Sequence, residues 1–342
     1  MIPRRRTSDS TPKPTDSTPT NATIGRVVLG GLVSAVSAAV LGFLYFVICT
    51  PQSQYGMGLF CILPLLAGYL GTLTCGTKRI PSVKQNFHIG LYGFLFASLG
   101  VLGAAYEGII CVAMAVPTVL PLIFLGSYLG RRQLLYFRDR SFTKRNMAVL
   151  PILPLCVIYF ARQIPTPQVR TETTTIIVNA PPEKIWPYLF NLDSVSGPLW
   201  LPFAYGVAHP YKIEARGQFV GANRVCQIST GPMPEKVTAI EPNRLLRFKV
   251  LDTPPTMKEL NPIFEVHAAH LTGYFHCRTG EFQLRPLPGG RTEIIGTSVY
   301  DYEVYPSVYW GLWTDTIVEQ VHVRVMQEIK RRAEADFAPA SP

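Results

Sequence analysis

The chain has 342 residues, of which 48% are hydrophobic and only 16% charged, a composition too apolar for an ordinary soluble protein of this length. Residues 1–161 hold 14 Lys and Arg against 4 Asp and Glu, whereas residues 162–342 hold 18 of each. The net charge of +10 therefore lies beside the apolar segments, which indicates loops held on the cytoplasmic side of a bilayer, and we expect no nucleic-acid partner.

Residues 1–24 are rich in Ser, Thr and Pro and contain almost no large apolar side chain. Such a segment cannot bury enough surface to offset the entropy that it would lose on ordering, so we predict a disordered tail. We predict a second, short disordered tail over residues 337–342.

Four apolar segments follow the first tail and predict transmembrane helices. The first, residues 27–49, is uncharged for 23 residues, or about 34 Å of helix, enough to cross a hydrocarbon core. The others cover residues 57–75, 88–105 and 109–130. Small residues at helical spacing in the first segment predict close packing of these helices as a bundle. They are Gly30, Gly31, Ser34, Ser37 and Ala38.

Along the chain, polar connections that contain Lys and Arg alternate with connections that contain none. Residues 1–26 hold five, residues 50–56 none, residues 76–88 three, the turn at 106–108 none and residues 131–147 six. This alternation predicts a multi-pass protein of the cell (inner) membrane with its N-terminus in the cytoplasm, and the lipid bilayer is a predicted partner.

A fifth apolar segment, residues 148–161, is only 14 residues long and contains Pro151 and Pro154. If it spans the bilayer, the C-terminal part lies outside the cytoplasm. If it is interfacial or re-entrant, the C-terminal part lies inside. We favour a span, because a short helix can be accommodated in a thin bilayer, and the predicted transmembrane domain is then residues 25–161.

After a predicted linker, residues 162–171, a second domain is expected over residues 172–336. The stretch TTTIIVNAPPEKIWPYLF, residues 173–190, alternates like a β-branched strand and then breaks at Pro181-Pro182 into a helix with an apolar stripe. Further strands are predicted at residues 211–217, 223–230, 235–241, 244–252, 273–286 and 292–303, and a long helix at about 307–335. An antiparallel sheet of this length must cover one face, and the last helix is the element long enough to do so.

Several motifs of this domain carry a family resemblance. Ile176 to Trp186, the run Arg278-Thr-Gly-Glu281-Phe282, the Pro-Gly-Gly-Arg-Thr turn and a terminal helix ending Ile329-Lys-Arg resemble the SRPBCC (START-like, polyketide cyclase/dehydrase) superfamily over residues 170–336. The whole chain resembles bacterial multi-pass membrane proteins with such a domain at the C-terminus. The resemblance implies a helix-grip fold, in which an antiparallel sheet wraps a long C-terminal helix around a hydrophobic cavity, and it implies no single reaction.

The cysteines and histidines give little sign of a metal or a cofactor. Five of the seven cysteines lie in apolar segments, and the other two have no CxxC or Cys/His ligand spacing, so we expect neither a disulfide scaffold nor structural zinc. His267, His270 and His276 could form a polar pocket cluster or a metal site. We favour histidines that hydrogen-bond where a loop enters a strand, and we predict no metal and no cofactor.

Two further questions concern where side chains point. If Phe282 and Leu284 face inward, counting back along the strand at 273–286 places Tyr274, His276 and Arg278 inward as well. A bulge at Gly280 would reverse the alternation and turn Phe275 and Cys277 inward instead. Asp315, Glu319 and His322 share one face of the final helix. This face could point into the pocket and carry an acid–base pair, or it could be the outer face of the helix, exposed to solvent. We favour the solvated face.

The candidate ligand-binding residues are mainly aromatic, although such residues are more often plain core when taken one at a time. They are Trp186, Trp200, Phe203, Tyr205, Phe248, His270, Tyr274, His276, Trp313 and Ile317. No catalytic residue is assigned.

The leading hypothesis is a membrane-anchored domain that binds a lipid or another hydrophobic small molecule. One alternative is a cyclase or dehydratase acting on a hydrophobic substrate, which needs an inward-facing His or Asp. The other is a membrane sensor or assembly factor whose domain contacts a protein partner.

Overall fold

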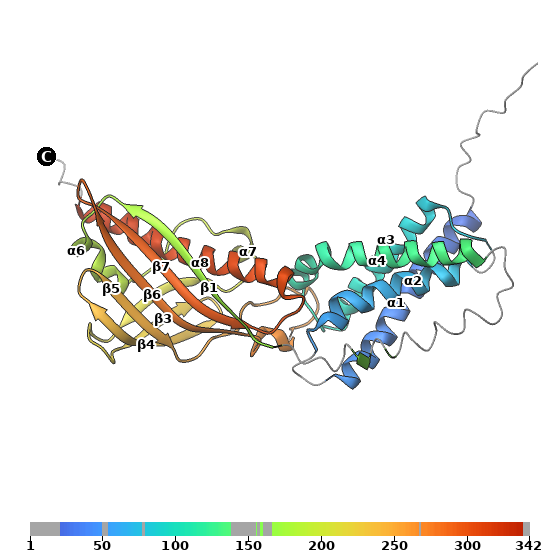
Figure 1. Cartoon of the computed structure of the whole chain (residues 1–342), viewed down its shortest axis with the longest axis horizontal. Coiled ribbons are helices and arrows are strands. Elements are labelled where there is room, and N and C mark those ends of the chain that lie inside the picture. Colours follow the sequence, from blue (N-terminus) through green and yellow to red (C-terminus); the bar gives the residue numbers. More distant parts are fainter. Residues whose placement is uncertain are drawn as a thin grey trace, which may run out of the picture.

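The computed structural model describes residues 21–49, 54–76, 79–137, 155, 158–159, 166–266 and 268–337. Most of both predicted tails, His267, and the predicted fifth span apart from Leu155, Ile158 and Tyr159 lie outside this part of the chain. The described residues form two halves that lie end to end, a bundle of helices and a sheet wrapped along one long helix (Figure 1).

Among the described residues, four helical segments are long and apolar enough to cross a membrane, as predicted. They are α1 (Asn21–Ile48), the π-helical turn η2 (Gly58–Ile62) together with α2 (Leu63–Cys75) that directly follows it, α3 (Val83–Gly103) and α4 (Ile109–Phe137). Helix α1 begins at Asn21, inside the segment predicted to be a disordered tail. Helix α3 begins with a capping box, in which Ser82 accepts from the backbone N–H of Gln85 and Gln85 accepts from that of Ser82.

Glycines allow the helices to approach at backbone distance. A Cβ atom on Gly68 of α2 would overlap the carbonyl group of Ile123 in α4, and one on Gly31 of α1 would overlap Tyr92 of α3. Membrane helices gain packing contacts in this way, because lipid tails offer no hydrophobic driving force for association. The predicted packing of the small residues of α1 is confirmed at Gly31 and at Ser34, which a Cβ atom on Gly71 of α2 would overlap.

The other half is a seven-stranded antiparallel sheet in the order β1-β7-β6-β5-β4-β3-β2. Its strands are β1 (Gln168–Val178), β2 (Pro210–Ala215), β3 (Asn223–Ile228), β4 (Gly231–Glu241), β5 (Leu245–Val250), β6 (Phe275–Leu287) and β7 (Arg291–Tyr302). Short helical turns follow β1: α6 (Pro182–Ile185), η4 (Trp186–Leu189) and α7 (Leu201–Ala204). Each predicted strand is present, and β4 begins four residues before its prediction.

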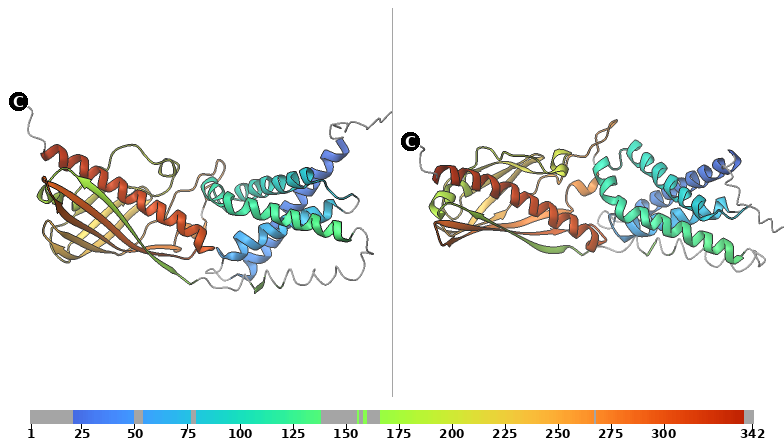
Figure 2. Two further views of the ribbon diagram at one scale, coloured as in Figure 1. Left: turned by 45° about the horizontal axis from the view of Figure 1, so that its top comes forward. Right: turned by 90° about the horizontal axis from the view of Figure 1, so that it is seen from above.

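Helix α8 (Ser307–Phe337) lies along the sheet, starting beside the helical half and ending at the far end of the molecule (Figures 1 and 2). Its second half is buried in a filled core with η4 and the strands β5, β6 and β7. The core includes Trp186, Leu189, Phe190, Leu246, Phe248, Phe282, Ile294, Val325, Met326 and Ile329. The predicted helix-grip arrangement of sheet and helix is therefore confirmed.

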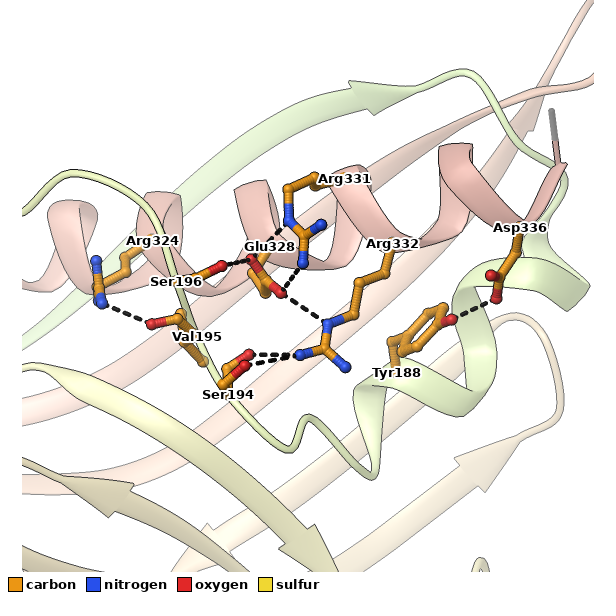
Figure 3. A network of polar contacts seen from close by, with 9 residues as sticks. All are labelled: Tyr188, Ser194, Val195, Ser196, Arg324, Glu328, Arg331, Arg332 and Asp336. Atoms are coloured by element: carbon orange, nitrogen blue, oxygen red, sulfur yellow. Dashed lines mark hydrogen bonds and ion pairs between the residues drawn. The ribbon is translucent and has the colours of Figure 1, made fainter.

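Glu328 fixes the loop after η4 to the far end of α8 (Figure 3). Its carboxylate accepts hydrogen bonds from Arg331 (2.6 Å), Arg332 (2.7 Å) and Ser196 (2.8 Å). The bond from Arg331, supported by those from Arg332 and Ser196, lowers the pKa of Glu328 to about 2 against the opposing effect of burial. Arg332 also donates to the carbonyl of Ser194, so the helix and the loop are joined by charge-assisted bonds.

Strand β6 contains a register shift between Cys277 and Thr279. On the N-terminal side of the shift, Phe275 and Cys277 are partly buried, whereas His276 and Arg278 are exposed. The reversed alternation is therefore correct, with the irregularity at Arg278 and not at Gly280. A Cβ atom on Gly280 would overlap the ring of Phe248, which accounts for the glycine at that position.

An ion pair between Arg224 and Glu235 is buried in the sheet half, with exposed side-chain fractions of 2% and 1%. Arg224 also donates from Nε to the carbonyl of Leu189 at 3.1 Å, and its guanidinium lies 4.6 Å from the ring centroid of Phe248. A charge left unpaired at this depth is strongly destabilising, whereas an apolar replacement of both partners is often tolerated.

We predict that Glu235→Leu lowers the unfolding free energy of this half by about 3–5 kcal/mol and that adding Arg224→Met recovers most of the loss. All four tryptophans lie between residues 186 and 313, so denaturant unfolding followed by tryptophan fluorescence reports on this half within the full chain. A double variant less stable than the single one would contradict the explanation.

His322 lies on the sheet-facing side of α8 and is buried, with 6% exposure. Its Nδ1 atom is 3.0 Å from the hydroxyl of Thr174, and its Nε2 atom is 2.8 Å from that of Ser298. The interpretation of this helix face as solvated is therefore wrong for His322. Burial lowers the pKa of His322 to about 4.

We predict that this histidine makes the fold less stable in acid. Between pH 6.5 and about 4 the unfolded histidine takes up a proton that the folded one does not, so stability falls with decreasing pH by about 1.4 kcal/mol per unit. His322→Gln should reduce the slope of the unfolding free energy against pH in this window by about that amount, whereas His276→Gln, at an exposed site, should leave it unchanged. An equal slope in both variants would contradict the assignment.

Candidate functional site

A cavity of about 1150 Å³ lies where the two halves meet, and both halves contribute to its lining. From the helical half, apolar residues of α1, α3 and α4 form one wall. These include Leu32, Val36, Phe43, Phe94, Val101, Val112 and Val119. Val36 and Phe43 are exposed on α1, so this end of the cavity opens to the outer face of the helices.

The first half of α8 forms the opposite wall. Trp313, Ile317 and Val321 line the cavity there, next to Trp310 and Met257. The lining continues between the sheet and the helix at Ile228, Met233, Cys277 and Ser298. The space inside the sheet is thus filled along the second half of α8 and open along the first half, where it faces the membrane-type helices.

Backbone and side-chain contacts hold the halves together around this cavity. The backbone N–H of Tyr305 donates to the carbonyl of Tyr55 at 2.9 Å, and that of Ile109 donates to the carbonyl of Leu260 at 2.8 Å. The Asn261 side chain donates to the carbonyl of Leu102 at 2.7 Å. The loop between β5 and β6 is therefore attached to the turn between α3 and α4.

Glu259 of that loop caps the first turn of α4. Its carboxylate accepts from the backbone N–H of Cys111 at 2.9 Å and from that of Ile110 at 3.2 Å. A negative side chain at a helix N-terminus satisfies N–H groups that lack a partner within the helix and interacts favourably with the helix dipole.

A polar cluster interrupts the apolar lining at this junction. The Sγ atom of Cys111 is 2.9 Å from Nε2 of His270, and Nδ1 of His270 is 3.5 Å from Oε2 of Glu107. The other carboxylate oxygen of Glu107 accepts a hydrogen bond of 2.7 Å from the hydroxyl of Tyr55. Three separate segments therefore meet at this cluster: Tyr55 lies just before η2, Glu107 lies in the α3–α4 turn, and His270 belongs to the sheet half.

Burial governs the protonation of this cluster. It raises the pKa of Glu107 to about 7, with a smaller contribution from the nearby charge of Glu259, and it lowers the pKa of His270 to about 4. Both shifts favour neutral groups in an environment with little water.

The structure brings four of the predicted ligand-binding residues to the cavity: His270, Tyr274, Trp313 and Ile317. Trp200 and Phe203 pack in an apolar cluster next to it, and Trp186 and Phe248 lie in the filled core. Tyr205 is 54% exposed, and His276 is exposed beside the carbonyl of Gly273.

Sequence reasoning missed Tyr55, Glu107, Cys111 and Met257 as lining residues. One signal for Glu107 was available, since it is the sole Asp or Glu between residues 17 and 138. A lone carboxylate between two apolar helices is costly to desolvate, and such residues are often functional.

Comparison with known proteins agrees with this architecture. A model of the family described as "Polyketide cyclase / dehydrase and lipid transport" matches residues 170–334. No curated protein matches the chain.

Solved structures that resemble the sheet half include the Zhui aromatase/cyclase from Streptomyces sp. R1128, with 16% identity over 51% of this chain and 99% of that chain and a TM-score of 0.34. Norcoclaurine synthase from Thalictrum flavum matches with 12% identity over 51% of this chain and 97% of that chain and a TM-score of 0.32. The Aha1 dimer from Colwellia psychrerythraea matches with 16% identity over 48% and 96% of the two chains and a TM-score of 0.29. The family match, the strand order and the position of α8 agree: residues 170–334 are a C-terminal domain of the polyketide cyclase/dehydrase and lipid transport family, carried behind four apolar helices.

Proposed function

We propose that this protein is anchored in a membrane by its four apolar helices and binds a lipid or another hydrophobic small molecule in the cavity between its two halves. The observation that carries the proposal is the continuity of the lining. Apolar side chains run from Val36 and Phe43 on the outer face of α1 to Met233 and Val321 inside the sheet.

The size and chemistry of the cavity fit such a ligand. Its volume of about 1150 Å³ exceeds the roughly 300–1,000 Å³ of ordinary small-molecule pockets. An acyl chain gains about 0.8 kcal/mol per buried CH₂ on leaving water, whether it enters a bilayer or an apolar cavity. A continuous apolar lining therefore allows the chain to move between the two without exposure to water.

The polar cluster gives the ligand an orientation. The hydroxyl of Tyr55, the carboxyl of Glu107 and the imidazole of His270 line the cavity at the junction of the halves. A polar head group would rest against these residues, with its apolar part among Trp313, Ile317 and the helices.

The alternatives find less support in the geometry. A cyclase or dehydratase using a histidine beside Asp301 would need both groups in the cavity. His270 lines the cavity, but its carboxyl neighbour there is Glu107. Asp301 is not among the lining residues and accepts a hydrogen bond of 2.5 Å from Arg278, and His276 is exposed. A role in protein contacts alone would be favoured by a filled interior, whereas the space along the first half of α8 is open.

We predict that Ile317→Trp retains the thermal stability of the protein within a few degrees but loses uptake of an apolar fluorescent dye or lipid, because the indole occupies the cavity. The matched control is Ile329→Trp, about three turns further along the same helix. It lies in the filled core, where Ile329 is 0% exposed. Overpacking there should cost about 1–3 kcal/mol without blocking the cavity. Equal destabilisation by both variants would show a packed interior at Ile317.

The proposed orientation keeps the N-terminus in the cytoplasm and the C-terminal domain outside it. Cysteines introduced at Ser141 and Ser194 test it, in a background where the native cysteines do not react. An impermeant thiol reagent applied to intact cells should label Ser194→Cys, which is at an exposed position, and leave Ser141→Cys unlabelled. The reverse pattern would invert the topology, and protection of both would place the domain in the cytoplasm.

A further inference from the structure

The cluster of Glu107, Cys111 and His270 has the composition of a metal site. Each residue offers one donor atom, a carboxylate oxygen, a sulfur or an imidazole nitrogen, and the three atoms lie within 4.8 Å of one another. The donors come from the α3–α4 turn, the first turn of α4 and the helical turn η5 (Ala269–Leu271) of the sheet half. All three residues line the cavity.

Two buried atoms of this cluster lack a hydrogen-bond partner, Oε2 of Glu107 and Nδ1 of His270. Buried polar atoms are nearly always satisfied, so an orphaned donor and acceptor facing each other need a physical explanation. They are 3.5 Å apart. Two ligand atoms bound tetrahedrally to one Zn²⁺ at about 2.0–2.1 Å lie roughly 3.4 Å apart, so this pair has the separation of two ligands of one ion. The sulfur of Cys111 contacts the other ring nitrogen, Nε2, so it joins the same ion only if the Cys111 or His270 side chain rotates.

Two carboxyl groups lie close to this position. Glu107 and Glu259 are both near Cys111, and neither forms an ion pair with a Lys or Arg side chain within the part of the chain that the structure describes. Buried carboxylates are normally paired or bound to metals. The hydroxyl of Tyr55, bonded to the other oxygen of Glu107, provides the kind of outer contact that orients a ligating carboxylate.

We propose that Glu107, Cys111 and His270 bind a divalent cation of the Zn²⁺ class at the junction of the two halves, with a fourth coordination position open to the cavity. Thiolate, imidazole and carboxylate together favour Zn²⁺ over Mg²⁺ or Ca²⁺, which prefer oxygen ligands. Three protein ligands with an open position are typical of zinc sites that bind an exchangeable molecule. This proposal replaces the sequence-based expectation of no metal.

The same three residue types also occur as a nucleophilic triad of thiol, imidazole and carboxylate, but the surroundings favour a metal. Acyl transfer needs N–H groups free to stabilise an oxyanion. At the start of α4, the N–H groups of Ile110 and Cys111 donate to Glu259, and that of Ile109 donates to Leu260. Two neighbouring carboxylates oppose a free thiolate, whereas a bound cation would stabilise it.

Such a metal has two consequences. It would join the membrane-type helices to the C-terminal domain by coordinate bonds, since its ligands come from both halves. The second consequence rests on the proposed function: the open position would take a polar oxygen of the molecule held in the cavity.

The test uses the full chain in detergent, stripped of metal by a chelator and then titrated with Co²⁺ and Zn²⁺ in the absence of added lipid. We expect about one ion per chain, a thiolate-to-Co²⁺ charge-transfer band that Zn²⁺ displaces, and a higher melting temperature with Zn²⁺. Cys111→Ser should lose the band, and Cys111→Ser, His270→Gln and Glu107→Gln should each bind at least tenfold more weakly. Cys61→Ser and His276→Gln are the controls and should behave like the unchanged protein.

The proposal is overturned if the unchanged protein binds no ion, or if Cys111→Ser keeps the thiolate band. It is also overturned if Zn²⁺ raises the melting temperature of Cys111→Ser as much as that of Cys61→Ser, a comparison that holds even where a variant is less stable. Dye or lipid uptake is measured separately on the metal-free chain. Uptake without metal binding would refute the site alone, and metal binding without uptake would refute the proposed function alone.

Discussion

The structure depends on how far a single helix fills the space inside a curved sheet. Along the second half of α8, Val325, Met326 and Ile329 meet side chains from η4 and from strands β5–β7, and the interior is closed. Along the first half, Ile317 and Val321 pack on one side against the cluster that contains Phe203 and line the cavity on the other, so the interior stays open. Because the open end faces the apolar helices, the cavity of the domain and the space between the helices become one.

This arrangement explains why the junction is both polar and buried. Glu259 caps α4 while Asn261 and Leu260 form hydrogen bonds with the end of α3 and the start of α4, so the loop between β5 and β6 attaches the sheet half to the helical half. Because this attachment uses backbone groups and a helix cap, it fixes the position of one half relative to the other without filling the cavity between them. The polar groups that it brings together, Glu107 and His270 among them, then lie at the midpoint of an otherwise apolar passage.

Much of the fold could be predicted from the sequence because its signals are local. The change of period at residue 172, the break at Pro181-Pro182 and the four apolar segments identify nearly every element. The direction of side chains in β6 could not be chosen, since it depends on a register shift at Arg278 that comes from pairing with β7. His322 was misread because its hydroxyl partners, Thr174 and Ser298, come from β1 and β7, far away in the sequence.

The site was less predictable than the fold for the same reason. Trp186 and Trp313 are equivalent as sequence features, but one lies in the filled core and the other lines the cavity. Cys111 and His270 are 159 residues apart, and no ligand spacing connects them. Only the docking of the domain on the helices brings them together.

The most direct test of a continuous passage is labelling with a lipid that carries a photoreactive group at the end of an acyl chain, in vesicles that contain the full chain. After irradiation, we expect cross-links both on α1 and α3 and on peptides that contain Met233, Cys277 or Val321, inside the sheet. Cross-links confined to the outer faces of the helices would show that the acyl chain does not enter the domain, and would rule out a continuous passage.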